Sequence, residues 1–510
     1  MMNISKNPYL SLVHRNLPRL LGLYNIDTTD PHCGCGDRRY WAWKLIDFPN
    51  GTFQGAAFGL SKLLVAGLLP KELNEVEIQK RIEFMITVIP SLMDQKGAMN
   101  ESLPNEGSFC VTGLVLADCL GAIQTLDNRL NASKRKKLIQ CLEPLAKFLM
   151  RQEETHGIIS NHLATNALAM VRWSLMTGSK QSLNRAKFWL KKIQSSANQE
   201  GWMLEYSGAD PGYQSWCSSA LAQIIEISPD LDLEPLLDKS YSFLEAFALP
   251  DGSFSNGCGS RMTRFLMAGG AEMQAKKSKS AARLASFARL HLKSNKFVTL
   301  DSIDELNLIP FFNDTVLAAV NAQEIIKSLP KTKTRNFPNA GIYVNVNKKN
   351  ISIINTKRGG WVSMTKFFRE DTTKINPEPV AKGPNGQVLK SVRGKVIGYS
   401  SDKIIIQSDL EVVERMLPSP IKFIVLRLLS ITAFKSLSLG NLVKRLLVKI
   451  LLSESGKTVG RVERTIIFST GKISDKVLSG DVKLIPNNKG FSPFHMASQG
   501  YWQMSDDTSS

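Results

Sequence analysis

Apolar residues recur at spacings of three and four from about Phe53 to Leu329, which is the period of an amphipathic α-helix. Breaks rich in glycine, proline and asparagine separate the periodic stretches. We expect helices at Phe53–Leu69, Glu75–Leu92, Thr112–Leu126, Ala132–Met150, His162–Met176, Ser182–Ile193, Tyr213–Ile227, Leu233–Phe247, Arg261–Leu292 and Asn313–Leu329. Their number and length predict a toroid of helical hairpins, although a helical solenoid would show the same period.

The pattern changes after Pro330 to short segments rich in β-branched and aromatic residues, many of them alternating in polarity. We expect strands at Gly341–Val346, Ile351–Asn355, Trp361–Phe367, Gly386–Val392, Lys395–Tyr399, Lys403–Gln407, Glu411–Arg415, Arg464–Ser469 and Asp481–Ile485. Turn residues between them predict an antiparallel β-sandwich. The predicted fold class is α+β and multidomain, with an N-terminal (α/α) toroid over 1–330 and a C-terminal antiparallel β-sandwich over 331–510.

Residues 416–453 interrupt the strand pattern with apolar stretches that contain no acidic residue. Basic residues occur too often for a segment that spans a bilayer: Lys422, Arg427, Lys435, Lys444, Arg445 and Lys449. The apolar residues of 439–451 form one helical stripe, and the basic residues there lie mostly off it. A basic amphipathic helix within 421–452 predicts contact with an anionic membrane surface. The alternative is an insertion packed on the toroid, with its basic side chains reaching water.

The chain has 510 residues with 64 basic and 45 acidic side chains, a formal net charge of +19. Residues 331–510 hold 29 of the basic and 13 of the acidic residues, so this part alone carries +16. A basic surface favours acidic partners such as a polyanionic saccharide or anionic lipid. The sequence shows no nucleic-acid-binding motif, and we expect no nucleic-acid partner.

The first 25 residues lack the apolar core and small-residue cleavage site of a secretory signal. The seven cysteines are an odd number spread over a long chain, which is typical of a reducing compartment. We therefore expect a cytoplasmic protein, peripheral on the inner face of the membrane if residues 421–452 bind lipid.

Two short motifs carry the candidate chemistry. Residues 201–216, GWMLEYSGADPGYQSW, run from a turn through an extended stretch into a helix, with Tyr213 in its first turn. A phenol there can act as acid or base when nearby cations lower its pKa. Asn161 and His162 begin an earlier helix, where they can bind an anion with help from the helix dipole. Taken alone, Tyr213 would more simply be a packing residue and Asn161 an N-cap.

Together the two motifs resemble the heparinase II/III-like and alginate-lyase families of polysaccharide lyases, which join an (α/α) toroid to a β-sandwich. The resemblance implies that Asn161 and His162 hold a uronate carboxylate. It also implies that Tyr213 protonates the leaving oxygen, with the role of base open to it as well. The loops RRYWAWK (38–44) and PNEGSF (104–109) resemble cleft-facing loops of such proteins. Candidates for stacking on sugars or pairing with uronates are Trp41, Trp43, Trp216, Arg38, Arg39 and Arg261.

The function that the resemblance implies is eliminative cleavage of an acidic, uronate-containing polysaccharide, in the setting of envelope polysaccharide biosynthesis. Elimination requires a group that neutralises the uronate carboxylate, a base for the C5 proton, and an acid for the departing oxygen. The three predicted catalytic residues are of the types that this chemistry needs.

The sequence departs from these families in the β domain, where members usually supply a further histidine and some bind zinc. His495 is the only histidine after His291, so it is a candidate substrate-binding residue, with Tyr206 and Lys366 as possible substitutes. We expect neither a metal nor a cofactor. One alternative function is a non-catalytic, membrane-associated saccharide-binding protein of capsule or O-antigen assembly. Another is a toroid glycoside hydrolase with carboxylates drawn from Glu205, Asp210 and Asp251.

Overall fold

The structure is a computed structural model that describes residues 7–155, 157–322, 329–330, 333–367, 373–412, 419–452 and 456–486. His495 lies outside the described residues, as do residues 413–415 of the predicted strand Glu411–Arg415 and 323–328 of the predicted helix Asn313–Leu329.

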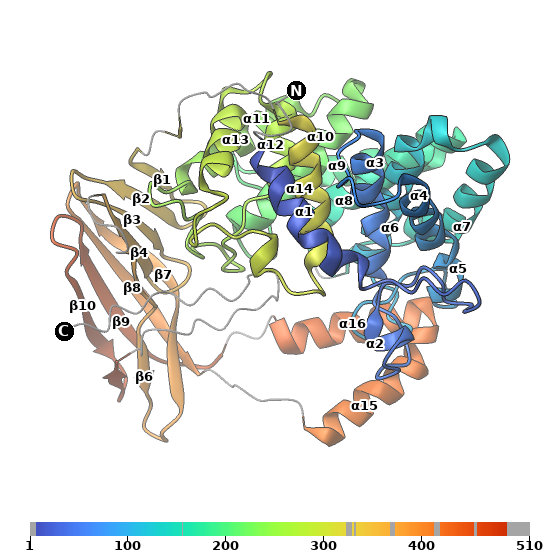
Figure 1. Cartoon of the computed structure of the whole chain (residues 1–510). Coiled ribbons are helices and arrows are strands. Elements are labelled where there is room, and N and C mark those ends of the chain that lie inside the picture. The colour runs from blue at the N-terminus through green and yellow to red at the C-terminus, as the bar shows by residue number, and fades with distance from the viewer. Residues whose placement is uncertain are drawn as a thin grey trace.

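The helical part is a closed ring of inner helices, each paired with an outer helix (Figure 1). The inner helices contact one another in the order α3, α6, α8, α10, α12, α14 and back to α3. Their outer partners are α4, α7, α9, α11, α13 and α1, in the same order. The bounds are α1 Pro8–Leu21, α2 Arg38–Trp41, α3 Ala56–Val65, α4 Glu75–Thr87, α5 Ile89–Leu92, α6 Phe109–Thr125, α7 Ala132–Arg151, α8 Ser160–Thr177, α9 Lys180–Ser196, α10 Pro211–Ile227, α11 Glu234–Leu244, α12 Gly269–Gln274, α13 Lys279–His291 and α14 Leu308–Asn321. This arrangement is the predicted (α/α) toroid.

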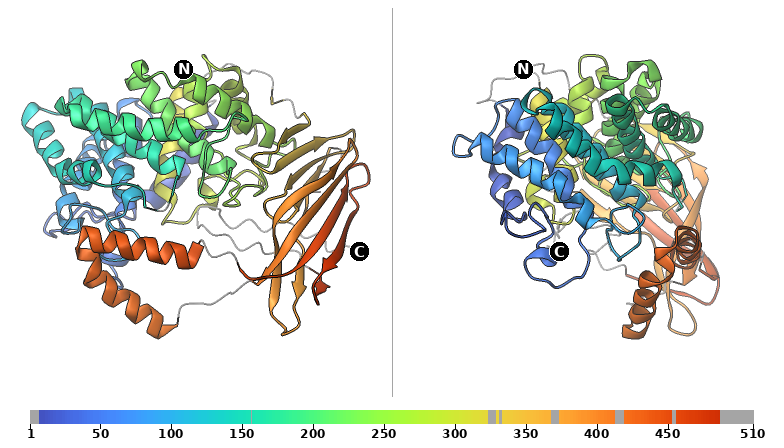
Figure 2. Two further views of the ribbon diagram at one scale, coloured as in Figure 1. Left: turned by 180° about the vertical axis from the view of Figure 1, so that it is seen from behind. Right: turned by 90° about the vertical axis from the view of Figure 1, so that its right-hand side faces the viewer.

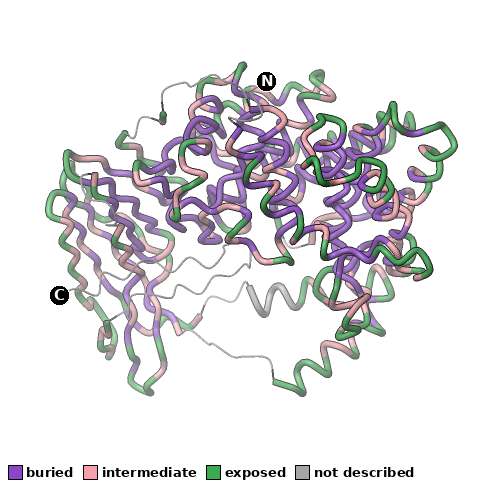
Figure 3. Tube along the Cα trace, viewed as in Figure 1, coloured by how far each residue is buried: buried purple, intermediate pink, exposed green. Residues whose placement is uncertain are grey.

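Sequence explains which helices lie inside the ring. In α6, α8 and α10 most residues are buried, because these helices are apolar or small-residue-rich on most sides. The outer helices α7 and α9 bury only one stripe and expose lysines on the other face. Figure 3 shows the result as a buried centre surrounded by exposed outer turns and loops.

Two antiparallel sheets follow the helices and form the predicted sandwich. The first has strand order β1-β2-β3-β4-β5 and the second β10-β9-β8-β7-β6-β11. The bounds are β1 Arg335–Phe337, β2 Ile342–Val346, β3 Asn350–Asn355, β4 Trp361–Lys366, β5 Thr373–Asn376, β6 Val380–Lys382, β7 Val388–Tyr399, β8 Lys403–Val412, β9 Thr458–Ile467, β10 Ile473–Ser479 and β11 Lys483–Ile485. Ile354 and Val362 of the first sheet pack against Ile404, Ile406 and Ile466 of the second.

The first sheet also packs against the helical part, so every residue of β3 is buried. Phe337 of β1 contacts the rings of Phe243 and Phe247 near the end of α11. Asn355 at the end of β3 donates from Nδ2 to the Cys258 carbonyl in the loop that precedes α12. Both faces of this sheet are thus covered, one by helices and one by the second sheet.

Residues 420–452 fold into a helical hairpin of α15 (Pro420–Ile431), a 3-10 turn (Ala433–Lys435) and α16 (Leu437–Leu452). The hairpin is inserted between β8 and β9, which pair directly with each other. It lies alongside the helical part rather than against these strands (Figures 1 and 2). No helix in the described part of the chain is both long and apolar enough to cross a membrane.

Several boundaries differ from the sequence-based expectations. The single helix expected over Arg261–Leu292 is instead an irregular stretch followed by α12 and α13, with a break at 275–278. The two strands expected at Gly386–Val392 and Lys395–Tyr399 form one strand, β7, with a bulge where Arg393 adopts a φ of 50°. Strands β1, β5, β6 and β10 were not predicted because they are short or lack a clear alternation of polarity.

Candidate active site

A cavity of about 470 Å³ opens where the starts of α6, α8 and α10 meet the loops 101–108 and 152–155. Phe434, Asn441 and Lys444 of the hairpin form another part of its wall. The cavity brings together five of the predicted site residues, which are far apart in sequence: Asn161, His162, Tyr213, Trp216 and Arg261. A cavity of this size is in the range of ligand-binding sites.

Asn161 and His162 lie in the first turn of α8, but Asn161 does not cap it. Ile159 occupies the N-cap position and no side chain caps the helix. The capping role predicted for Asn161 is therefore wrong, because the helix begins one residue earlier, at Ser160, and Asn161 lies inside its first turn. The backbone N–H of Asn161 donates to Glu205 Oε1 at 2.9 Å. The Asn161 side chain is buried, and its Oδ1 has no hydrogen-bond partner among the described residues. A polar atom in this situation is suited to contact a ligand.

His162 is oriented by the carboxylate of Glu154, which was not among the predicted site residues. Its Nδ1 lies 2.7 Å from Glu154 Oε2, and both side chains are largely buried. A carboxylate at Nδ1 fixes the ring and leaves Nε2 for a ligand. No local motif marks Glu154, since its contact with His162 forms only when the loop before α8 folds back.

Glu205 holds the start of α8 and also faces Arg261. Its side chain is fully buried, and Oε2 lies 3.7 Å from Arg261 Nη1. Burial raises the pKa of Glu205 to about 8, against the opposing effects of the Arg261 charge and the Asn161 N–H. At neutral pH Glu205 is therefore mostly protonated.

Tyr213 lies in the first turn of α10, directly beneath Arg261. The guanidinium carbon of Arg261 is 3.5 Å from the centroid of the Tyr213 ring. The Trp216 ring lies nearly parallel to the Tyr213 ring, with ring centroids 6.1 Å apart and planes 11° apart. Burial lowers the pKa of Arg261, but Tyr213 and Glu205 outweigh it and the pKa is raised above its usual value. Arg261 is thus a permanent cation beside the phenol.

Asp210 fixes the relative positions of Tyr213 and Arg261. It caps α10 by accepting the Tyr213 N–H at Oδ1 (3.2 Å), and its Oδ2 accepts the Arg261 N–H at 2.9 Å. Thr263 Oγ1 also donates to Oδ1. Because both oxygens are engaged in this way, Asp210 is a scaffold residue rather than an acid or base. Asp251, another carboxylate considered for a hydrolase, instead contacts Lys296 and Thr373 and does not line the cavity.

Tyr206 also lines the cavity and adopts a left-handed backbone conformation with a φ of 57°. This conformation is uncommon for a residue other than glycine and often occurs at functional sites. Burial raises the pKa of Tyr206 to about 12 despite the nearby Arg261, so its phenol remains a hydrogen-bond donor at neutral pH. Of the substitutes considered for the missing histidine, Tyr206 lies in the cavity, whereas Lys366 is exposed at the end of β4.

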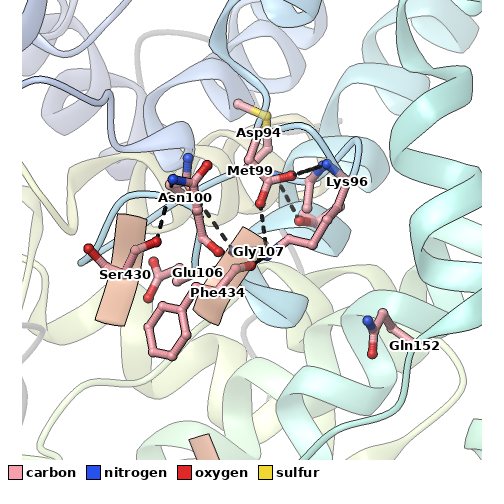
Figure 4. A network of polar contacts seen from close by, with 12 residues as sticks. Asp94, Lys96, Met99, Asn100, Glu106, Gly107, Gln152, Ser430 and Phe434 are labelled. Carbon is pink, nitrogen blue, oxygen red and sulfur yellow. Dashed lines mark hydrogen bonds and ion pairs between the residues drawn. The ribbon is translucent and has the colours of Figure 1, made fainter. Parts of the chain in front are cut away.

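The hairpin completes the wall through a network of polar contacts with the loop 94–107 (Figure 4). Lys96 Nζ donates to the carbonyls of Asn105 and Phe434 at 2.6 Å each and pairs with Asp94. Lys444 Nζ donates to the carbonyls of Glu106 and Gly107. Burial lowers the pKa of Lys444, although nearby Glu106 opposes this effect. Lys444 is one of the basic residues off the predicted apolar stripe, and in the structure it lines the cavity.

The loop 38–44 does not reach this cavity. Arg39 pairs with Asp37 at 3.1 Å, and Trp41 Nε1 donates to the Leu23 carbonyl at 2.9 Å. Trp43 is 62% exposed, with the Arg38 guanidinium 5.8 Å from its ring centroid. None of the four predicted residues Arg38, Arg39, Trp41 and Trp43 is among the lining residues. No group of three or more His, Cys, Asp or Glu in the described residues is placed to hold a metal ion.

The fold is similar to the folds of solved polysaccharide lyases. Chondroitin AC lyase of Streptomyces coelicolor A3, in complex with chondroitin sulphate, matches with a TM-score of 0.52 and 9% identity over 81% of this chain and 68% of that one. A tyrosine-to-alanine variant of the same lyase has a TM-score of 0.50 and 10% identity over the same shares of the two chains. A Paenibacillus xanthan lyase has a TM-score of 0.49 and 9% identity, covering 81% of this chain, which spans 46% of that lyase.

No known family profile matches the chain, and no curated protein matches it in sequence. The structural similarity nevertheless shows that the chain has the fold of polysaccharide lyases, a helical toroid followed by antiparallel β-sheets.

Proposed function

We propose that the protein is a heparinase II/III-like lyase that cleaves an acidic, uronate-containing polysaccharide by β-elimination in envelope polysaccharide biosynthesis. The observation that carries the proposal is the stack of Arg261 on Tyr213, in a cavity that Asn161 and His162 also line. The fold of polysaccharide lyases supports it, and one lyase with this fold was solved in complex with chondroitin sulphate.

In the proposed reaction, Asn161 and His162 bind the uronate carboxylate, so that negative charge can move from C5 toward that group. Tyr213, as the phenolate, removes the C5 proton, the C4–O bond breaks with its electron pair on oxygen, and a double bond forms between C4 and C5. The Tyr213 phenol formed in this way donates the same proton to the departing oxygen, which restores the phenolate for the next cycle. Arg261 stabilises that phenolate because opposite charges attract at this distance.

The test is the ultraviolet absorbance of unsaturated uronate when the purified protein meets a panel of uronate polymers. We expect Tyr213→Phe to reduce the rate by at least about 100-fold, since it removes the transferred proton. Tyr241→Phe is the matched control, because Tyr241 is also buried and its hydroxyl has no hydrogen-bond partner in the described residues. Full activity in Tyr213→Phe would contradict the assignment.

The second candidate is a saccharide-binding protein without turnover, cytoplasmic and held at the inner face of the membrane by residues 421–452. The observation that favours it is the row of exposed apolar side chains on α15, which a protein wholly surrounded by water would not need. Calorimetric binding of a uronate polymer that Trp216→Ala weakens, together with no absorbance on any polymer, would support this candidate over the lyase.

A further inference from the structure

The α15–α16 hairpin exposes a broad apolar surface on the side away from its contacts with the loop 94–107. On α15 the exposed residues recur at helical spacing and are 41–74% accessible: Ile421, Ile424, Val425, Leu428 and Ile431. On α16, Leu439, Leu442 and Leu446 are also exposed, at 46–57%. Figure 3 shows α15 as mostly exposed along its length. Contiguous apolar surface of this kind marks a site of contact with another molecule or a membrane.

The opposite side of the hairpin is held on the helical part, so the apolar surface cannot turn inward. The Ser430 carbonyl accepts from Asn105 Nδ2 at 3.5 Å, and Asn441 Nδ2 donates to Gln152 Oε1 at 3.2 Å. Arg427 forms an ion pair with Asp47. These contacts fix which residues face solvent.

Charge identifies the kind of partner. Lys422, Lys435 and Arg445 are exposed on the hairpin, and residues 419–452 contain no acidic side chain. Rows of apolar side chains bordered by cations match the boundary between lipid chains and anionic headgroups, where the helix lies in the plane of the interface. A protein partner would need an apolar groove with acidic edges, whereas an anionic bilayer supplies both features over any area.

We propose that this outward surface of residues 420–446 docks on an anionic lipid bilayer. The docking does not depend on whether the cavity is catalytic. Because Phe434 and Lys444 of the same hairpin form part of the cavity wall, docking holds the candidate active site next to the membrane surface.

The experiment is sedimentation of the full chain with vesicles of phosphatidylcholine, with and without phosphatidylglycerol. We expect binding only to the anionic vesicles. The triple variant Lys422→Gln/Lys435→Gln/Arg445→Gln should weaken partitioning by roughly 100-fold, since each cation near the surface is worth about a fivefold change. Lys71→Gln/Lys136→Gln/Lys137→Gln is the matched control for charge, because these lysines are exposed on the helical part.

The apolar contribution is tested with Ile424→Ser/Leu428→Ser, which are 58% and 54% exposed in the wild type. Val76→Ser/Leu175→Ser, at 62% and 55%, removes equally exposed apolar side chains elsewhere. Loss of sedimentation in the first pair alone supports the proposal. It is overturned if the wild type does not sediment or if the controls lose binding equally. Dimerisation that Ile424→Ser/Leu428→Ser abolishes, without vesicle binding, would assign the surface to a second copy of the chain and also overturn it.

Discussion

At the scale of single residues, burial rather than sequence neighbours gives the site its electrostatic character. Glu205 and Asp210 are close in sequence and both fully buried, yet they differ in role. Asp210 accepts hydrogen bonds on both oxygens from the groups it positions. The Glu205 Oε2 has no hydrogen-bond partner among the described residues, and burial raises the pKa of Glu205 to about 8. Both are candidate carboxylates in the sequence, and nothing in their local sequence distinguishes the two roles.

The raised pKa of Glu205 predicts how the stability of the folded protein depends on pH. The pKa of Glu205 is about 8 in the folded protein, above its ordinary value of 4.5. Between pH 4.5 and pH 8 the carboxyl group is therefore ionised in the unfolded chain and protonated in the folded one. The free energy of unfolding therefore falls as pH rises through this window, by about 1.4 kcal/mol per pH unit for this one group. In Glu205→Gln, whose amide oxygen can still accept the Asn161 N–H, we expect this part of the slope to vanish.

The measurement is urea unfolding at several pH values from 5 to 8 for the wild type and the variant. Other buried acids with raised pKa, such as Asp118 and Glu272, contribute equally to both proteins, so the difference between the slopes isolates Glu205. Glu77→Gln, on an exposed carboxylate, should leave the slope unchanged. Equal slopes for the wild type and Glu205→Gln would show that Glu205 is already ionised in the folded protein.

At the scale of elements, the sequence predicted whether most segments are helices or strands. It did not predict how closely the inner helices approach one another. The 3.6-residue period sufficed for the long helices, because their burial repeats along the chain. The close contact of α6 with α8 depends on Gly113, where an added Cβ would lie 1.8 Å from Asn166 Oδ1. Asn166 is fully buried and donates to the His162 carbonyl at 2.8 Å. Such a contact cannot be inferred from the period of either helix alone.

Gly113→Ala tests this contact. Alanine has the higher helix propensity, but the buried Asn166 would have to leave its place, so we expect a net loss of about 1–3 kcal/mol in unfolding free energy. Because Asn166 bonds to the first turn of α8, saccharide binding should weaken as well. The control is Gly208→Ala, whose added Cβ would meet only Ser260, at 3.5 Å. Unfolding in urea and binding calorimetry measure the two effects, and a Gly113→Ala protein as stable as Gly208→Ala would refute the packing argument.

The hairpin is the element for which sequence left two interpretations, a membrane-facing helix or an insertion packed on the toroid. Its inner side does pack on the helical part, through contacts that include the Lys96–Phe434 hydrogen bond. Lys96→Met should loosen the hairpin and speed amide hydrogen exchange across 433–446, with little change in the helices of the ring. Lys80→Met, on an exposed lysine of α4, is the control. Unchanged exchange in Lys96→Met would show that other contacts hold the hairpin.

At the scale of the whole molecule, the β-sandwich acts on the candidate site from a distance. Apart from the hairpin, no residue beyond 330 in the described chain lines the cavity. The sandwich instead holds the loop that carries Arg261, because Asn355 and Arg358 donate to the carbonyls of Cys258 and Gly257. The sequence indicated a β domain after the toroid but not this role, which depends on a turn of one domain meeting a loop of the other.

Asn355→Ala tests whether the sandwich positions Arg261. Loss of the buried hydrogen bond leaves the Cys258 carbonyl unpaired and frees the loop, which costs about 1–3 kcal/mol and a corresponding fall in turnover of roughly tenfold or more. Since Asn161, His162 and Trp216 are untouched, KM for a uronate polymer should change much less than kcat. Asn336 lies on the same sheet as Asn355, and its exposed side chain pairs with Tyr399 of the second sheet. Asn336→Ala removes this pair and should change neither constant. If kcat is unchanged in Asn355→Ala while the protein is destabilised, the sandwich supports the fold of the toroid without setting the position of Arg261.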